Sequence, residues 1–251
     1  IIMNNNNDKC IKDIKVGDKL KNNNYVYAKF TLSGNHEKYN MFNLNDVIIS
    51  GNHKVKYLGE WINVKDHNDS NLIEYKDSII YNLVTFNKTI TTDNNEFKDY
   101  DEMTDDEIER LSNLSNQNLF NNLGLFKNFT GGFHGDTILV KNNNEEVKIK
   151  DINVNDVLDG DVKVLGVVEI DAFELDVPII RNINGVLVTC SNNVLYEDYL
   201  GKVMKVDTLN ATRNEIKNLK KLYHLITDKN YFYIKFIKFY DYDYLIDFYL
   251  E

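Results

Sequence analysis

Ser50 and His53 lie three residues apart and are the first candidates for chemistry in this chain. Imidazole is the side chain whose charge changes near neutral pH, so a histidine that follows a short apolar strand can take part in proton transfer. Two interpretations of His53 stay open. It is either a catalytic residue or a histidine that forms a hydrogen bond to a neighbouring turn.

A metal site is a second kind of chemistry to consider, because Asp66, His67 and Asp69 carry zinc-type ligands and follow His53 closely. Their spacing matches no standard zinc pattern, so we expect a solvated loop and predict no metal site and no cofactor.

The remaining reactive side chains have plainer explanations. Cys10 and Cys190 occupy non-equivalent positions, and Cys190 is expected to be a small, half-buried strand residue. His134 and Asp136 lie on a predicted turn, where Asp136 is expected to accept backbone N–H bonds.

Composition excludes several classes of protein. The 251 residues carry a net charge of −10, which argues against binding to nucleic acid, because that requires a basic surface. A hydrophobic content of 43% suffices for one large core or two small ones, and no apolar run is long enough to predict a membrane span. Two cysteines make no disulfide framework, and no signal-peptide pattern is visible, so we expect a cytoplasmic or virion-associated protein, although an upstream targeting segment is not excluded.

The elements that must position these residues belong to an internal repeat. Residues 1–32 align without gaps on 139–170, and residues 49–55 align on 188–194. From Gly59 onward the offset is 142, so that Phe97-x-Asp99-Tyr100-Asp101 meets Phe239-x-Asp241-Tyr242-Asp243. The chain therefore contains module one, residues 1–103, and module two, residues 132–251.

Local patterns predict an all-β fold for both modules, because short β-branched or aromatic runs alternate with Asn, Asp and Gly turns. The aromatic run from Tyr231 to Tyr244 is expected to form a core strand or a strand edge that docks onto a neighbour. Between the modules, residues 104–131 begin with a capping box, Thr104-x-x-Glu107, and predict a short helical connector.

The order of these motifs resembles the Hint module, the hedgehog/intein self-processing domain, over nearly all of both copies. The resemblance depends on the segments Ile11–Leu20 and Ile149–Leu158, on Ser50-x-x-His53 and on the opening Gly132-Phe133-His134-Gly135-Asp136-Thr137. It implies autocatalytic cleavage, in which a thiol or hydroxyl attacks the preceding peptide carbonyl and a histidine protonates the leaving nitrogen.

Both modules depart from that family pattern. Module two has Gly132 where the nucleophile belongs, with Thr189 and Asn192 aligned on Ser50 and His53, so it is expected to be inactive. In module one the nucleophile position falls upstream of Ile1. Neither module ends in the His-Asn pair that splicing requires.

Two functional hypotheses follow. In the first, module one performs a single-turnover self-cleavage with an upstream nucleophile, His53 and Ser50, beside a degenerate module two. In the second, both modules are non-catalytic packing units of a larger protein assembly, for example a viral capsid. A third reading, a domain that binds a small ligand, has only the generic fold in its favour.

Overall fold

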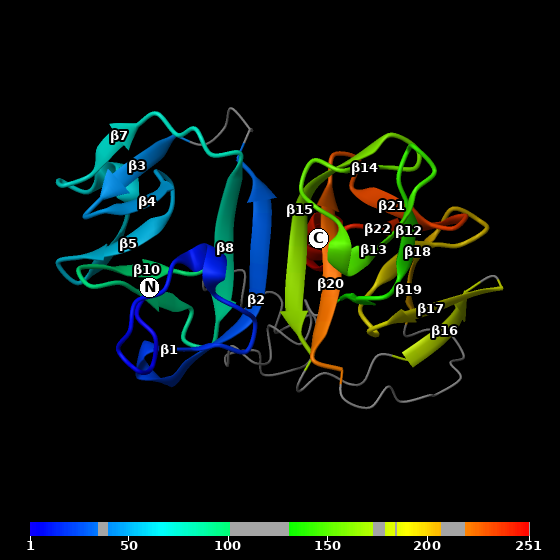
Figure 1. The fold of residues 1–251 in the computed structure, drawn as a ribbon, viewed down its shortest axis with the longest axis horizontal. Helices are drawn as coiled ribbons and strands as arrows, with labels where there is room; N and C mark the ends of the chain where they lie inside the picture. Colours follow the sequence, from blue (N-terminus) through cyan, green and yellow to red (C-terminus); the bar gives the residue numbers. More distant parts are fainter. Residues whose placement is uncertain (35–39, 101–130, 173–178, 184, 207–218, 251) are drawn as a thin grey trace. The chain divides into compact units, whose positions relative to one another are not determined.

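A computed structural model describes residues 1–34, 40–100, 131–172, 179–183, 185–206 and 219–250, and the all-β prediction is confirmed for them (Figure 1). The chain divides into two compact units, Ile1–Glu102 and Met103–Glu251. The connector helix predicted for residues 104–131 lies outside the described residues, apart from Gly131.

Module one is built from short antiparallel strands and single turns of 3-10 helix. Its strands are β1 (Lys19–Leu20), β2 (Asn24–Ser33), β3 (Met41–Leu44), β4 (Val47–Ser50), β5 (Lys54–Tyr57), β6 (Glu60–Asn63), β7 (Asn71–Ile73), β8 (Ile79–Thr85), β9 (Thr89–Thr91) and β10 (Glu96–Lys98), with 3-10 turns η1 (Ile11–Asp13), η2 (Lys21–Asn23) and η3 (Val64–Asp66). The long strand β2 pairs with β1 and β8, while β6, β5, β10 and β9 form a second sheet and β4, β3 and β7 a third.

Module two repeats much of this arrangement among the described residues. Its elements are β11 (Phe133–His134), β12 (Ile138–Val140), β13 (Glu146–Lys148), η4 (Ile149–Asp151), β14 (Val157–Leu158), β15 (Val162–Asp171), β16 (Ile179–Ile183), β17 (Val186–Cys190), β18 (Leu195–Glu197), β19 (Val203–Lys205), β20 (Lys221–Thr227), β21 (Tyr231–Ile234), β22 (Ile237–Tyr240) and α3 (Tyr242–Leu250). Strands β15, β20, β11, β17 and β16 follow one another in its main sheet, and β19, β18, β22 and β21 form the second.

The sequence offsets coincide with the structural elements. Strands β2 and β15 are related by the offset of 138, and β8 and β20 by the offset of 142. Both long strands also shift register at the same place, between Val26 and Ala28 in β2 and between Val164 and Gly166 in β15. The repeat seen in the sequence is therefore a repeat of backbone geometry.

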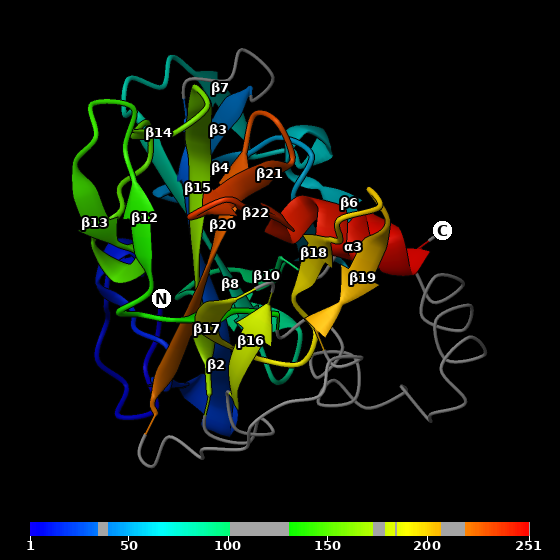
Figure 2. The same ribbon diagram turned by 90° about the vertical axis from the view of Figure 1, so that its right-hand side faces the viewer.

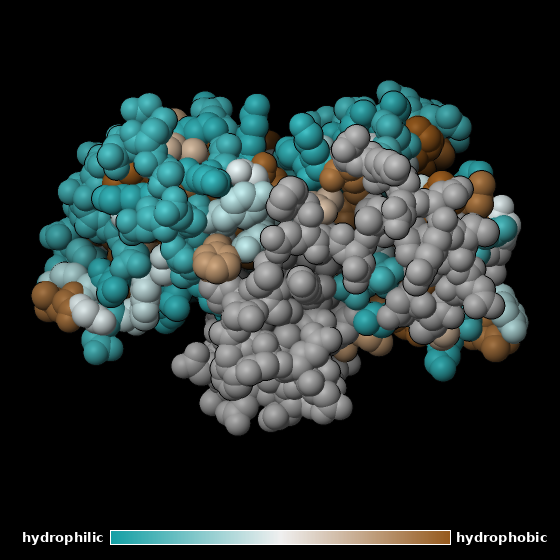
Figure 3. All heavy atoms as spheres, turned by 90° about the horizontal axis from the view of Figure 1, so that it is seen from below, coloured by the Kyte–Doolittle hydropathy of each residue, from teal (hydrophilic) through white to brown (hydrophobic). Residues whose placement is uncertain are grey.

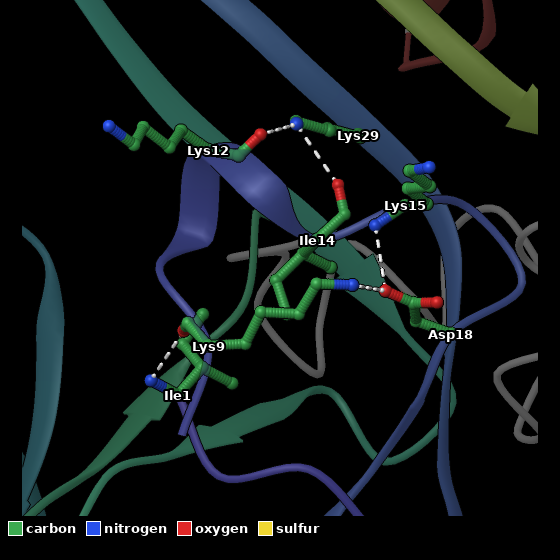
Figure 4. A network of polar contacts seen from close by, with 7 residues as sticks. All are labelled: Ile1, Lys9, Lys12, Ile14, Lys15, Asp18 and Lys29. Atoms are coloured by element: carbon green, nitrogen blue, oxygen red, sulfur yellow. Dashed lines mark hydrogen bonds and ion pairs between the residues drawn. The ribbon is translucent and has the colours of Figure 1, made fainter. Parts of the chain in front are cut away.

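The shared Ile-Lys-Asp-Ile motif forms a turn that an aspartate closes (Figure 4). In module one, Asp18 accepts hydrogen bonds from the Lys15 amide at 2.9 Å and from Lys9 Nζ at 2.6 Å. Burial alone would raise the pKa of Asp18, but these bonds hold it below its usual value. Asp156 closes the same turn in module two by accepting from the Asn153 amide at 2.9 Å.

Module one adds a buried lysine to this turn. Lys29 donates from Nζ to the carbonyl oxygens of Lys12, at 2.5 Å, and Ile14, at 3.0 Å (Figure 4). These contacts satisfy carbonyl groups at the end of η1, where a helical turn leaves acceptors without internal partners. Lys29 is therefore a structural residue of module one.

Asparagine builds many of the turns, which gives its abundance a structural reason. Asn6, Asn22, Asn45, Asn144 and Asn230 all have positive φ values. Asparagine tolerates this left-handed conformation better than most side chains because its short amide bonds locally to the backbone.

The C-terminal aromatic run differs in part from the prediction. Phe232 and Phe239 are fully buried in β21 and β22, as expected of core strands. From Tyr242 onward, however, the chain forms helix α3 rather than a strand (Figure 2). The reason is a cap, because Asp241 Oδ1 accepts a hydrogen bond from the Tyr244 amide at 3.0 Å, the contact that an N-cap residue makes to the third helical residue.

The described surface is mainly hydrophilic on the face shown in Figure 3, with small separate hydrophobic areas. No helix in the described part of the chain is long and apolar enough to cross a membrane.

Candidate functional site

Gly132, the predicted nucleophile position of module two, lies directly before β11 in a closed backbone environment. Its amide donates to Ser191 Oγ at 2.9 Å, and its carbonyl accepts from the Ser191 amide at 2.9 Å. A Cβ atom added to Gly132 would lie 2.9 Å from the Cβ of Leu222, closer than real Cβ contacts. The position therefore has neither a side chain nor the space for one.

The hydroxyl nearest to Gly132 belongs to Ser191, not to the predicted Thr189. Thr189 pairs with Ile180 in the β16–β17 hairpin and is half-buried, whereas Ser191 is buried beyond the end of β17. Side chains alternate along a strand, so Thr189 shares the outward face of the exposed Leu187. That alternation was the one signal in the sequence against Thr189.

Asn192 and His53 have different places in their modules. The Val64 amide bonds the His53 carbonyl at 2.8 Å, and the equivalent Val206 amide bonds the Val194 carbonyl at 3.0 Å. These matched hydrogen bonds align His53 with Val194. Module two is therefore two residues longer than module one in this turn, and Asn192 belongs to the insertion.

His53 and Ser50 are held at the turn between β4 and β5. The Ser50 carbonyl accepts from the His53 amide at 3.1 Å, and the buried imidazole has its Nε2 atom 2.7 Å from the Lys98 carbonyl. A carbonyl oxygen only accepts hydrogen bonds, so Nε2 carries the proton in this contact. The side chain thus links the turn to β10.

The acidic and histidine residues after β6 do not gather into a metal site. His67 is buried, with Nδ1 accepting from the Asp69 amide at 3.1 Å and its ring packed against Tyr57. Asp66 instead accepts from the Asn63 side chain at 3.0 Å. Among the residues that the structure describes, no three His, Cys, Asp or Glu side chains are placed to bind one metal ion.

The turn at His134 and Asp136 differs from the expectation. Here the Asp136 amide donates to His134 Nδ1 at 3.1 Å, while the carboxylate pairs with Lys148 and Lys150, each at 2.9 Å. The hydrogen bonds from these two lysines lower the pKa of Asp136 to about 2. The carboxylate therefore forms ion pairs with lysines on the surface, where we had expected hydrogen bonds from backbone N–H groups.

The cysteines also occupy unrelated environments. Cys10 is exposed, whereas Cys190 is completely buried in β17, deeper than the half-buried strand position that we predicted.

A buried threonine–aspartate pair, which we call the clamp, occurs in both modules. In module two, Asp241 Oδ2 accepts from the Thr227 amide at 2.7 Å and from its hydroxyl at 3.0 Å. In module one, Asp99 Oδ2 accepts from the Thr85 amide at 2.6 Å and from its hydroxyl at 3.0 Å. The sequence contained the signal, since both residues repeat at the offset of 142, but their contact is visible only in the structure.

His224 is a completely buried titratable side chain of module two. Its Nδ1 accepts from the Leu225 amide at 2.9 Å, and its ring packs against Phe133, Phe232 and Tyr242. Burial lowers the pKa of His224 to about 4. In module one, Asn82 takes this place and its Oδ1 accepts from the Leu83 amide at the same distance, 2.9 Å.

The geometry that the two modules share is therefore that of the aspartate-closed turns and of the buried threonine–aspartate clamp. A scan against models of known protein families and a search of curated proteins gave no match.

Proposed function

We propose that the chain is a structural protein built from two Hint-like modules and that module two does not cleave peptide bonds. The observation that carries this proposal is the closed backbone position at Gly132. Self-cleavage of the Hint type requires a thiol or hydroxyl on the residue after the scissile bond, because that atom forms the ester intermediate. Gly132 supplies no such atom.

A packing role is supported by exposed apolar side chains at equivalent hairpins of the two modules. Leu58, between β5 and β6, is 88% exposed, and Leu200, between β18 and β19, is 75% exposed. Each precedes a glycine with positive φ, Gly59 or Gly201, so the equivalent hairpin presents a leucine to solvent in both modules, although its connection is longer in module two. An apolar side chain held outward twice is suited to packing in a larger assembly, of which a viral capsid is one example.

Restoring a thiol at Gly132 tests the assignment of module two. We expect Gly132→Cys to destabilise module two by about 1–3 kcal/mol through overpacking against Leu222, and to leave the chain uncleaved. Intact mass with and without dithiothreitol, and urea unfolding, measure the two effects.

Ile138→Cys is the matched control, because it introduces the same thiol at a strand position that is 40% exposed. Release of a fragment that ends at Gly131 from Gly132→Cys, but not from Ile138→Cys, would show that module two retains the cleavage machinery.

The second candidate function is self-cleavage by module one with an upstream nucleophile. The observation in its favour is His53. Its buried imidazole lies at the turn after β4, and its Nε2 atom is hydrogen-bonded to the Lys98 carbonyl. In this reading the imidazole takes up the proton that the upstream thiol or hydroxyl loses on attack, and it donates a proton to the leaving amide nitrogen.

Intact mass decides this candidate when the protein is expressed behind an N-terminal tag and its natural upstream sequence. Self-cleavage predicts loss of the tag before Ile1 in the wild type and in His67→Ala, and retention of the tag in His53→Ala. Retention of the tag in all three proteins would contradict self-cleavage, and the structural function would be the one that remains.

A further inference from the structure

Module two contains a strand that module one lacks in the described residues. Strand β11 lies between β17 and β20, with Phe133 in register with Cys190 on one side and with Tyr223 on the other. The Phe133 ring then packs edge-on against Phe232 and Phe239, at centroid distances of 5.6 and 5.2 Å. The strand thus closes the sheet and fills the core.

Module one keeps the two strands that flank this position. Strand β4 corresponds to β17, and β8 corresponds to β20. Within the described part of module one, β4 pairs with β3 and β8 pairs with β2, and neither has a strand on its other edge. We call the place between these two edges the strand slot.

Burial along the strand slot differs between the modules. Leu222 of β20 and Val188 of β17 are 0% and 2% exposed. Their equivalents in module one, Ile80 of β8 and Ile49 of β4, are only half-buried. Apolar side chains beside the slot in module one are therefore less covered than the same positions in module two.

The core of module one is divided at the same place. In module two, Phe133 belongs to one continuous cluster that includes Phe232 and Phe239. Their equivalents in module one, Ile90 and Phe97, fall into two separate clusters. A side chain in the place of Phe133 would touch both and join them.

We infer that the strand slot of module one binds an extended segment that directly precedes Ile1 in the polypeptide and carries an apolar side chain at the place of Phe133. Added strands of this kind gain affinity from main-chain hydrogen bonds and specificity from alternate side chains. Module two shows the occupant, since β11 directly precedes the β12–β13 hairpin.

The backbone at Ile1 is already in the register that this connection requires. Ile1 and Lys9 exchange hydrogen bonds at 3.0 and 2.9 Å, as do paired residues of a hairpin, and Leu139 pairs with Val147 at the equivalent place in module two (Figure 4). A preceding segment therefore leaves Ile1 in the direction that β11 takes before β12.

The test grafts the chain's own sequence Gly-Gly-Phe-His-Gly-Asp-Thr-Ile, residues 131–138, in front of Ile1 of the complete protein. Hydrogen exchange of the β4 and β8 amides is expected to slow by about tenfold or more, with a rise of about 4 °C or more in the melting temperature of module one. The graft has glycine at the nucleophile position, so this test is independent of self-cleavage.

Two controls make the result specific. One carries aspartate in place of the grafted phenylalanine, and the other carries the unchanged eight residues after Glu251. The inference predicts protection in neither control. Unchanged exchange in the grafted protein, protection by the aspartate graft, or equal protection by the C-terminal graft would each overturn it.

Discussion

Replacing Asp241 by alanine is expected to destabilise module two by about 3–5 kcal/mol. Asp241 is completely buried, and its two oxygens accept from the Thr227 amide, the Thr227 hydroxyl and the Tyr244 amide. Alanine leaves these donors without their acceptor, and each buried unsatisfied donor costs about 1–3 kcal/mol, partly offset by no longer burying a carboxylate. The substitution also removes the N-cap of α3.

Urea unfolding and hydrogen exchange of the β20 and α3 amides measure this effect. Asp228→Ala is the matched control, because Asp228 accepts one exposed backbone bond, from the Lys163 amide at 2.9 Å, and its loss is expected to cost about 1 kcal/mol or less. Equal effects of the two substitutions would show that the clamp is not a main source of stability.

Replacing His224 by asparagine is expected to make module two more stable at pH 4 than at pH 7. The pKa of His224 is lowered to about 4 by burial, below its ordinary value of 6.5. The unfolded chain therefore binds a proton at a higher pH than the native state does. The stability contributed by neutral His224 is complete above pH 6.5 and is lost as the pH falls toward 4, by roughly 3 kcal/mol.

Asp243 acts in the opposite direction over part of that range. Burial, together with Asp241 and Asp247, raises the pKa of Asp243 to about 6, above its ordinary value of 3.8. The stability that Asp243 contributes is thus complete below pH 3.8 and is lost as the pH rises through 6. In the wild type the two side chains offset each other between pH 4 and 6.

Asparagine at position 224 repeats what Asn82 does in module one, so the bond from the Leu225 amide has an acceptor in the variant. We expect His224→Asn to be more stable at pH 4 than at pH 7. We expect Asp243→Asn to be less stable at pH 4 than at pH 7. Denaturant midpoints at both pH values, monitored by hydrogen exchange of the β20 amides, give the change of stability with pH for each variant. Parallel slopes for the two variants would contradict this account.

Much of the fold was predictable because the repeat fixes it. The offsets of 138 and 142 place β2 on β15 and β8 on β20, and alternating apolar residues mark both as strands. Helix α3 was not predicted, because its start depends on one side-chain bond from Asp241 rather than on residue periodicity.

The candidate site was less predictable than the fold. A gap-free alignment set Asn192 against His53, whereas the two-residue insertion in module two is visible only through the bonds to Val64 and Val206. Ser191 was missed for a related reason, since a side chain beyond the end of a strand takes its direction from the turn.

The clamp also has a consequence for the order of folding. Thr85 and Asp99 are 14 residues apart, as are Thr227 and Asp241, whereas the pairing of β2 with β8 joins residues more distant in the chain, such as Thr31 and Tyr81. Closing a short loop loses less chain entropy than closing a long one, so the clamp segment of each module is expected to form before its long strands pair. During synthesis, module one can complete this step before any of module two has left the ribosome.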